Sequence, residues 1–190
     1  MQRPPVAERL SGVTAAPDDR GAHDHEPSPA ARLLVEQVHA THGQQLFGFV
    51  RRLGLGDEEA IEVTQESLFR LWRAASDGPR PERPVAWTYR TAYRLAMDRH
   101  RVRRRWLAFL GRQTAKPADS IDSRDALLAV WSEVDRLPGR QRQVIYLRYR
   151  ADLTFEDIGA VLGINASSAR SNGSRAIATL RDRLIEADAG

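Results

Sequence analysis

The chain has 190 residues, 42% of them hydrophobic and 28% charged, a composition typical of globular proteins with one or two small domains of about 100 residues each. It contains no cysteine, which excludes disulfides, thiol catalysis and thiolate metal sites. Its 29 Lys and Arg residues exceed its 25 Asp and Glu residues only modestly. The positions of the basic residues along the chain therefore say more about binding partners than the net charge does. No apolar run approaches the about 18–20 residues that span a bilayer, and the first residues hold no secretory apolar region, so we expect a cytoplasmic protein.

The first 28 residues lack hydrophobic periodicity and hold four prolines, so we predict a disordered N-terminal tail over residues 1–28. From Pro29, apolar residues recur at helical spacing and predict a first helix that ends at Gly54 and Gly56. Its expected buried face consists of Leu33, Val38, Leu46, Phe49, Val50 and Leu53. Asp57 is expected to cap a second helix. The apolar face of that helix is expected to hold Ile61, Leu68, Leu71 and Trp72.

A third helix is predicted from Pro84, since proline fits the first turn of a helix, where its missing N–H is not needed. Its expected buried face consists of Val85, Ala92, Leu95 and Ala96. Seven Lys or Arg residues and no acid lie between Arg99 and Lys116. Aromatic residues are interleaved with the arginines of this helix: Trp87, Tyr89, Tyr93 and Trp106. Since arginines neutralise phosphates and aromatic rings stack on unpaired bases, we predict that the helix contacts nucleic acid, with Trp87 placed in the core.

Residues 112–122 are predicted to form a flexible linker to a second helical block. The apolar residues expected in the core of that block are Leu127, Val130, Trp131, Val134, Leu137, Val144, Ile145 and Leu147. Period-2 alternation does not persist anywhere in the chain, which argues against strands. We therefore predict an all-α protein of two small helical domains, residues 29–111 and 123–187.

The end of the second block has the features of a helix-turn-helix. Thr154 is a predicted N-cap, Gly163 is expected to end the short first helix, and Asn165 can cap the second. The expected apolar residues of the two helices are Ile158, Val161, Leu162, Ala169, Ala176, Ile177, Leu180 and Leu184. In such motifs the second helix enters the major groove, and the candidates for DNA contact here are Ser167, Ser168, Arg170, Ser171, Asn172 and Arg175. Gly173 lies inside this helix, where glycine costs about 1 kcal/mol relative to alanine.

Three motifs occur in an order that resembles the extracytoplasmic-function (ECF) group of bacterial RNA polymerase sigma factors. They are residues 57–72 (DEEAIEVTQESLFRLW), residues 84–98 (PVAWTYRTAYRLAMD) with the arginines that follow, and residues 137–145 (LPGRQRQVI) continuing to Gly163. The resemblance implies a region 2-like domain over residues 29–111, which binds core polymerase and the −10 element, and a region 4-like domain over residues 123–187, which reads the −35 element. It also implies core polymerase (β′ and β subunits), promoter DNA and an anti-sigma factor as partners.

Carried over by residue, the resemblance assigns polymerase binding to Glu62, Gln65, Glu66 and Phe69. It assigns −10 strand contacts to Tyr89, Arg90, Arg94, Asp98, Arg101, Arg103, Arg104 and Arg105. It implies no cofactor and no catalysis, because the polymerase performs the chemistry.

Other functions remain as alternatives. A dimeric helix-turn-helix regulator could act without polymerase, and a sigma-like interaction module could have lost −35 reading, as Asn172 and Gly173 would allow. No catalytic motif is found, so an enzyme is not expected. Histidine pairs occur at residues 23–25 and at His39 and His42, but they are expected to be structural rather than to bind metal.

Overall fold

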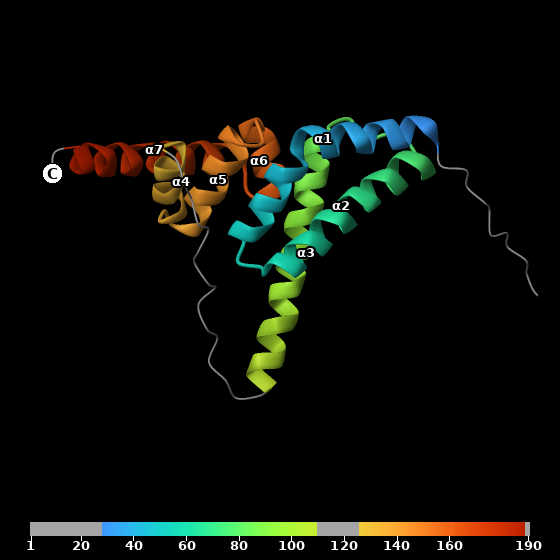
Figure 1. Ribbon diagram of the computed structural model, residues 1–190, viewed down its shortest axis with the longest axis horizontal. Coiled ribbons are helices and arrows are strands. Elements are labelled where there is room, and N and C mark those ends of the chain that lie inside the picture. The colour runs from blue at the N-terminus through green and yellow to red at the C-terminus, as the bar shows by residue number, and fades with distance from the viewer. Residues whose placement is uncertain (1–27, 110–125, 189–190) are drawn as a thin grey trace, which may run out of the picture.

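The computed structural model describes residues 28–109 and 126–188, and all regular elements within these ranges are α-helices (Figure 1). They are α1 (Pro29–Arg52), α2 (Asp57–Asp77), α3 (Pro84–Phe109), α4 (Ala126–Asp135), α5 (Gly139–Tyr149), α6 (Phe155–Leu162) and α7 (Ala166–Asp188). The all-α expectation is confirmed. The predicted linker and all but the last residue of the predicted tail lie outside the described residues.

Helix boundaries follow local sequence. Helix α3 begins at Pro84, as predicted, and the turn after α1 contains Gly54 at φ +91°, a conformation that favours glycine. The second helix differs by one position. Asp57 is its first helical residue, and Gly56 is the N-cap, whose N–H donates to the Glu59 carboxylate at 3.2 Å.

The helices of the first block, α1–α3, share one hydrophobic core with α5 and α6 of the second. From the first block this core takes Leu46, Phe49, Val50, Val63, Tyr89 and Ala92. From the second block it takes Val144, Tyr146, Leu147, Ile158 and Val161. Helix α6 packs against α3, and α5 against α1 (Figure 1). The two predicted blocks are therefore one packed body in this structure.

Polar contacts join the same two blocks. The Tyr146 hydroxyl donates to the backbone carbonyl of Gln45 at 2.9 Å, close to Gly48, where an added Cβ would lie 2.6 Å from that hydroxyl. Arg52 donates two hydrogen bonds to Asp135, at 2.8 and 3.2 Å. These contacts connect residues 83 and 101 positions apart in the chain.

Several residues expected in the core are exposed. In α1 the buried residue is Leu34 and not Leu33. In α2 the hydroxyls of Thr64 and Ser67 donate to backbone carbonyls one turn earlier, at 2.7 and 2.6 Å. Because these polar groups are satisfied within the helix, their side of α2 can be buried, and Ile61 faces outward. The other expected core residues that the structure exposes are Val130, Ile177 and Leu184.

Candidate nucleic-acid interface and docking face

A stripe of arginines runs along the exposed side of α3. Arg90, Arg94, Arg101 and Arg105 are spaced by four, seven and four residues, which places them on one side of a helix, and all four are exposed. At 1.5 Å per residue the stripe is about 22 Å long. We call these four residues the basic stripe, and its length suits contact with several phosphates.

Other arginines of α3 form ion pairs with acidic residues of α2. The sequence showed no acid between Arg99 and Lys116, so the basic end of α3 was expected to have no acidic partner, and this expectation is wrong. Arg99 pairs with Glu62 at 2.8 Å, and Arg103 pairs with Glu59 at 2.6 Å, both across to α2. Partial burial acts to raise the pKa of Glu59, but the hydrogen bonds from Arg103 and Gly56 and the charges of Arg103 and Arg99 outweigh it and lower that pKa. Arg103 therefore helps to hold α3 on α2.

Within the basic stripe, Arg101 also has an acidic neighbour. It pairs with Asp98 on its own helix at 3.1 Å. Arg104 and Arg105 are exposed and form no ion pair with any described residue. The unpaired positive charge near the end of α3 therefore lies at these two residues.

Tyr89 does not belong to the nucleic-acid surface, and its assignment to −10 strand contacts is wrong. Only 1% of its surface is exposed, and its ring meets those of Phe49 and His42 at centroid distances of 5.5 and 6.4 Å. Burial raises the pKa of its hydroxyl far above the usual value. A ring enclosed by α1 in this way cannot stack on a base. Trp87 is partly buried against the cluster that contains Leu34 and Leu71, close to the expected core position.

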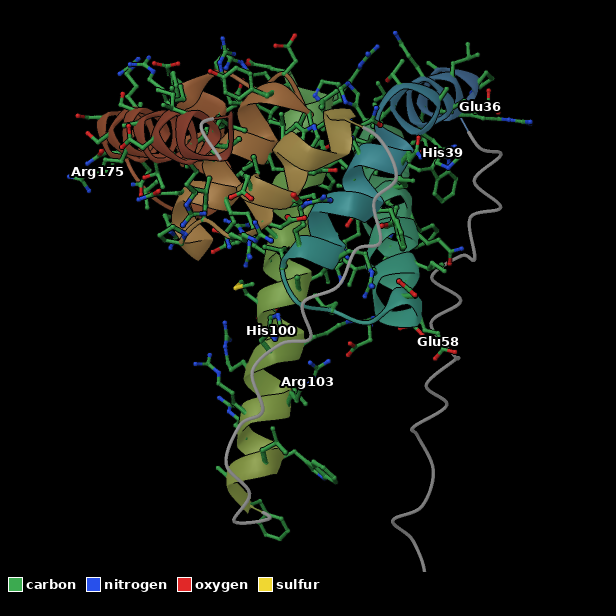
Figure 2. All side chains as sticks on the ribbon, turned by 60° about the vertical axis from the view of Figure 1, so that its left-hand side comes forward. Glu36, His39, Glu58, His100, Arg103 and Arg175 are labelled. Atoms are coloured by element: carbon green, nitrogen blue, oxygen red, sulfur yellow. The ribbon has the colours of Figure 1, made fainter. Side chains whose placement is uncertain are left out.

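The last part of α3 extends away from the other helices (Figure 1), and Figure 2 shows Arg103 on this projecting part. It carries three exposed apolar residues: Val102 at 65%, Trp106 at 60% and Phe109 at 87%. The sequence pattern identified Trp106 but not Val102 or Phe109. Their spacing of four and three residues was the available signal. We call residues 101–109 the α3 arm.

The exposed side of α2 is partly apolar. Ile61, Gln65, Phe69 and Trp72 are spaced by four, four and three residues, and the rings of Phe69 and Trp72 stack at 5.6 Å. We call these four residues the docking face. Glu66 is at its edge and pairs with Arg70 at 2.7 Å. Of the residues assigned to polymerase binding, Glu62, Gln65 and Phe69 are exposed and Glu66 is partly exposed. Ile61 and Trp72 were not assigned to this surface, because the sequence pattern placed them in the core.

The helix-turn-helix forms as the caps predict. Thr154 Oγ1 accepts a hydrogen bond from the Asp157 N–H at 3.1 Å, and Asn165 Oδ1 accepts one from the Ser168 N–H at 2.7 Å. Gly163 has φ +68°, which turns the chain between α6 and α7. Gly159, which the sequence pattern did not single out, packs directly under this turn. An added Cβ there would lie 2.7 Å from the carbonyl oxygen of Ile164.

The candidate DNA-reading residues lie at the start of α7. Ser167, Arg170, Ser171 and Arg175 are exposed, and Figure 2 shows Arg175 pointing away from the other helices. Asn172 is half-buried, and its amide donates to the Ser168 carbonyl at 2.8 Å within α7. Arg170 pairs with Glu156 of α6 and lies over the Phe155 ring, 5.8 Å from its centroid.

Gly173 has a packing role. It is buried, and an added Cβ would lie 3.2 Å from Phe155 and 3.5 Å from Val144. The glycine therefore lets α6 approach α7 closely, and these contacts offset the cost of about 1 kcal/mol that glycine carries inside a helix. In the sequence alone, this glycine suggested that the helix-turn-helix had lost −35 reading.

Comparisons with known proteins follow the same division of the chain. Residues 38–106 match the family model for Sigma-70 region 2, and residues 134–182 match that for Sigma-70, region 4. The chain is 31% identical over 184 residues to the ECF RNA polymerase sigma factor SigK of Mycobacterium ulcerans, covering 92% of this chain and 98% of that protein. The chain belongs to the ECF sigma factor family. It is also 24% identical to RNA polymerase sigma factor SigV of Bacillus subtilis, covering 82% and 93% of the two chains.

Two solved structures resemble this sigma factor. One is the sigma factor RpoE in complex with the anti-sigma factor NepR from Bartonella quintana, with a TM-score of 0.64, 20% identity, and coverage of 79% of this chain and 96% of that one. The other is CnrH in complex with the cytosolic domain of CnrY, with a TM-score of 0.53, 25% identity, and coverage of 83% and 90%. The first likeness supports the fold. Region 2 carries the basic stripe and the docking face, and region 4 carries the helix-turn-helix.

Within residues 28–109 and 126–188, no helix is long and apolar enough to cross a membrane. No group of three or more His, Cys, Asp or Glu side chains in the same ranges is placed to hold a metal ion.

Proposed function

We propose that this sigma factor binds core RNA polymerase through α2, positions it on duplex DNA through α7, and holds the opened strand along α3. The observation that carries the proposal is that both matched regions expose a surface of the appropriate chemistry. Region 2 exposes an apolar docking face on α2 and a basic stripe on α3, and region 4 exposes polar side chains at the start of a capped recognition helix. The polymerase supplies the catalysis, so the chain itself needs neither cofactor nor catalytic residue, and it works in the cytoplasm with the polymerase.

The polymerase contact centres on Gln65, Glu66 and Phe69. An exposed aromatic ring already stacked on Trp72 loses little side-chain freedom on binding, which makes Phe69 a good anchor. Glu62 and Glu66 border it with negative charge, although each is paired with an arginine in this structure. We place the partner on the β′ subunit, with the β subunit contacting region 4.

The first test is co-elution with core RNA polymerase on a sizing column. The wild-type chain is expected to co-elute at a ratio of one to one. Phe69→Ala should weaken binding by about 30-fold, since truncating a central anchor costs about 2 kcal/mol. The double variant Gln65→Ala/Glu66→Ala should also weaken it. Leu33→Ala is the control, because Leu33 is an exposed apolar residue on α1.

A wild-type chain that stays free of polymerase while binding duplex DNA would overturn the proposal. The dimeric helix-turn-helix regulator would then become the better interpretation, and sedimentation would have to show a dimer. The interaction-module alternative loses its main support, because Gly173 is explained by its contacts with Phe155 and Val144.

DNA contacts are assigned to both regions. On α3 we retain Arg90, Arg94, Arg101, Arg104 and Arg105 for the opened −10 strand, with Asp98 beside them. On α7 we retain Ser167, Ser168, Arg170, Ser171 and Arg175 for the −35 element, with Asn172 as a support inside the helix. Arginine is suited to the guanine edge, so Arg170 and Arg175 are the main candidates for base contacts.

An anti-sigma factor is the proposed regulator. Both structural relatives named above are complexes, one with the anti-sigma factor NepR and one with the cytosolic domain of CnrY. Such a partner would compete with polymerase for this chain. Adding it to the co-elution assay should displace the chain from polymerase.

A further inference from the structure

Helix α1 turns one side toward region 4. His42, Gln45, Phe49 and Arg52 follow one another at intervals of three, four and three residues, which places them on this side of the helix. Gln45 accepts the hydrogen bond from Tyr146, whose ring also meets Phe49, and Arg52 forms an ion pair with α4 at 2.8 Å. We call these four residues the junction side of α1. His42 is its one member whose side chain ordinarily changes charge between pH 5 and 8.

The surroundings of His42 disfavour its charged form. Its Nδ1 is buried and has no hydrogen-bond partner among the described residues, and its ring meets that of Tyr89 edge-on at a centroid distance of 6.4 Å. A protonated imidazole carries N–H donors on both nitrogens, so the charged form would leave a buried donor without an acceptor. Burial therefore lowers the pKa of His42 below its ordinary value of 6.5.

One acidic residue opposes this effect from region 4. Asp152 lies in the turn between α5 and α6, and its charge acts to raise the pKa of His42, although by less than burial lowers it. The Asp152 side chain is 96% exposed and lies 3.9 Å from Arg148, so solvent and a positive charge both weaken its effect. Tyr89 of α3 and Tyr146 of α5 are neutral, since burial raises the pKa of both hydroxyls. His42 is therefore uncharged while regions 2 and 4 are packed together.

We propose that His42 is a proton-sensitive latch, which lets α1 pack on region 4 while the imidazole is neutral and favours separation of the two regions once it is protonated. Separation exposes the imidazole to water and returns its pKa to about 6.5. The separated state then takes up a proton at a pH where the packed state does not. Packing is therefore at full strength above about pH 7.5 and weakens as the pH falls through about 6.5 toward the lowered pKa.

Separation of the regions has a consequence for promoter binding. By their names, the −10 and −35 elements lie about 25 base pairs apart, which is about 85 Å of DNA at 3.4 Å per base pair. Helix α6 packs against both α3 and α7. A helix is about 10–12 Å across and α3 is about 39 Å long, so the packed body falls short of that span. This consequence rests on the proposed function, whereas the latch itself is a property of the free chain.

The experiment measures how often the junction opens, through the reactivity of a buried thiol in the full chain. The chain has no cysteine, so Ala151→Cys places a single thiol in the core that both regions share. Ala176→Cys places one in a core built from region 4 alone and is the matched control. Both alanines are buried, so each thiol reacts with dithiodipyridine only when its surroundings open. Each rate is divided by the rate of the same thiol in a His42→Gln background, which cancels the pH dependence of the thiol itself.

Acid is expected to raise the rate ratio at position 151 and not at position 176. From about pH 8 to about pH 5.5 the ratio for Ala151→Cys should rise by up to about 10-fold, the limit for one proton with a pKa of about 6.5 in the separated state. His39→Gln is the control histidine, since His39 is exposed on the same helix, and it should leave the rise unchanged. Asp152→Asn should keep or enlarge the rise, because it removes the charge that favours protonated His42 in the packed state.

Three outcomes would overturn the latch: a level ratio at position 151, a rise that His39→Gln abolishes, or an equal rise at position 176, which would mean that His42 acts on the whole fold. His42→Leu replaces the glutamine reference if that variant folds poorly, and circular dichroism should show equal helix content in all variants across the pH range. No polymerase or DNA enters these measurements. Co-elution with core polymerase therefore tests the proposed function separately from the latch.

Discussion

Single glycines in this sigma factor are explained by what lies beside them. Gly173 and Gly139 make this clear because both are helical, yet their surroundings differ. An added Cβ at Gly173 would meet Phe155 at 3.2 Å and Val144 at 3.5 Å, whereas at Gly139 it would meet nothing within 4 Å. Substitution by alanine should therefore have different effects on stability at the two positions.

We expect Gly139→Ala to stabilise the protein by about 0.4–1 kcal/mol, because it restricts the unfolded chain without a clash. Gly173→Ala should give no such gain, and Gly173→Leu should destabilise by about 1–3 kcal/mol through overpacking against Phe155. Urea denaturation followed by circular dichroism would measure all three. If Gly173→Leu raised both the stability and the −35 binding of the protein, the interpretation that this helix has lost −35 reading would be supported instead.

At the scale of the helix, the ends could be predicted from sequence, whereas the buried sides could be predicted only in part. Pro84, Thr154, Gly163 and Asn165 act within a few residues of themselves, so their local chemistry was sufficient. The buried side of an amphipathic helix depends on which neighbour it meets. The apolar pattern therefore placed Leu33, Ile61 and Ile177 inside, where the structure exposes them.

The candidate surfaces were predictable to a similar degree. The residues Gln65, Phe69, Arg90 and Arg170 were found from sequence and are exposed. Tyr89 was misassigned because burial by α1 is a contact between residues 40 positions apart along the chain, between Phe49 and Tyr89, and local periodicity does not report it.

The cap of the recognition helix gives a prediction at this scale. Asn165→Ala should destabilise the protein by about 1 kcal/mol, because it leaves an N–H at the start of α7 without its partner. The residues that face DNA occupy that first turn, so −35 binding should weaken as well. Asn165→Ser retains a capping oxygen and should remain close to wild type. Thermal unfolding and duplex binding, measured on the same three proteins, would contradict the expectation if alanine and serine behaved alike.

On the scale of the whole molecule, the shared core makes regions 2 and 4 one folding unit in this structure. Tyr146 of α5 is buried among residues of α1, with Phe49 at a ring centroid distance of 6.0 Å and its hydroxyl bonded to the Gln45 carbonyl. A core that crosses between regions should unfold cooperatively. Calorimetry of the wild-type chain is therefore expected to show one transition, whereas two independent domains would show two.

A double-mutant cycle at Gly48 and Tyr146 tests this junction directly. Gly48→Ala should be destabilising, because its Cβ would lie 2.6 Å from the Tyr146 hydroxyl, at the end of a rigid buried ring. Tyr146→Phe should cost about 0.5–1.5 kcal/mol through loss of the hydrogen bond to Gln45. In the phenylalanine background the clash is gone, since the nearest ring carbon is an ordinary 3.6 Å from the added Cβ. The double variant should thus be more stable than the sum of the single losses by about 0.5–3 kcal/mol. Additive losses would mean that α1 and α5 are not in contact in solution, and that the two regions of this sigma factor move independently when it is free.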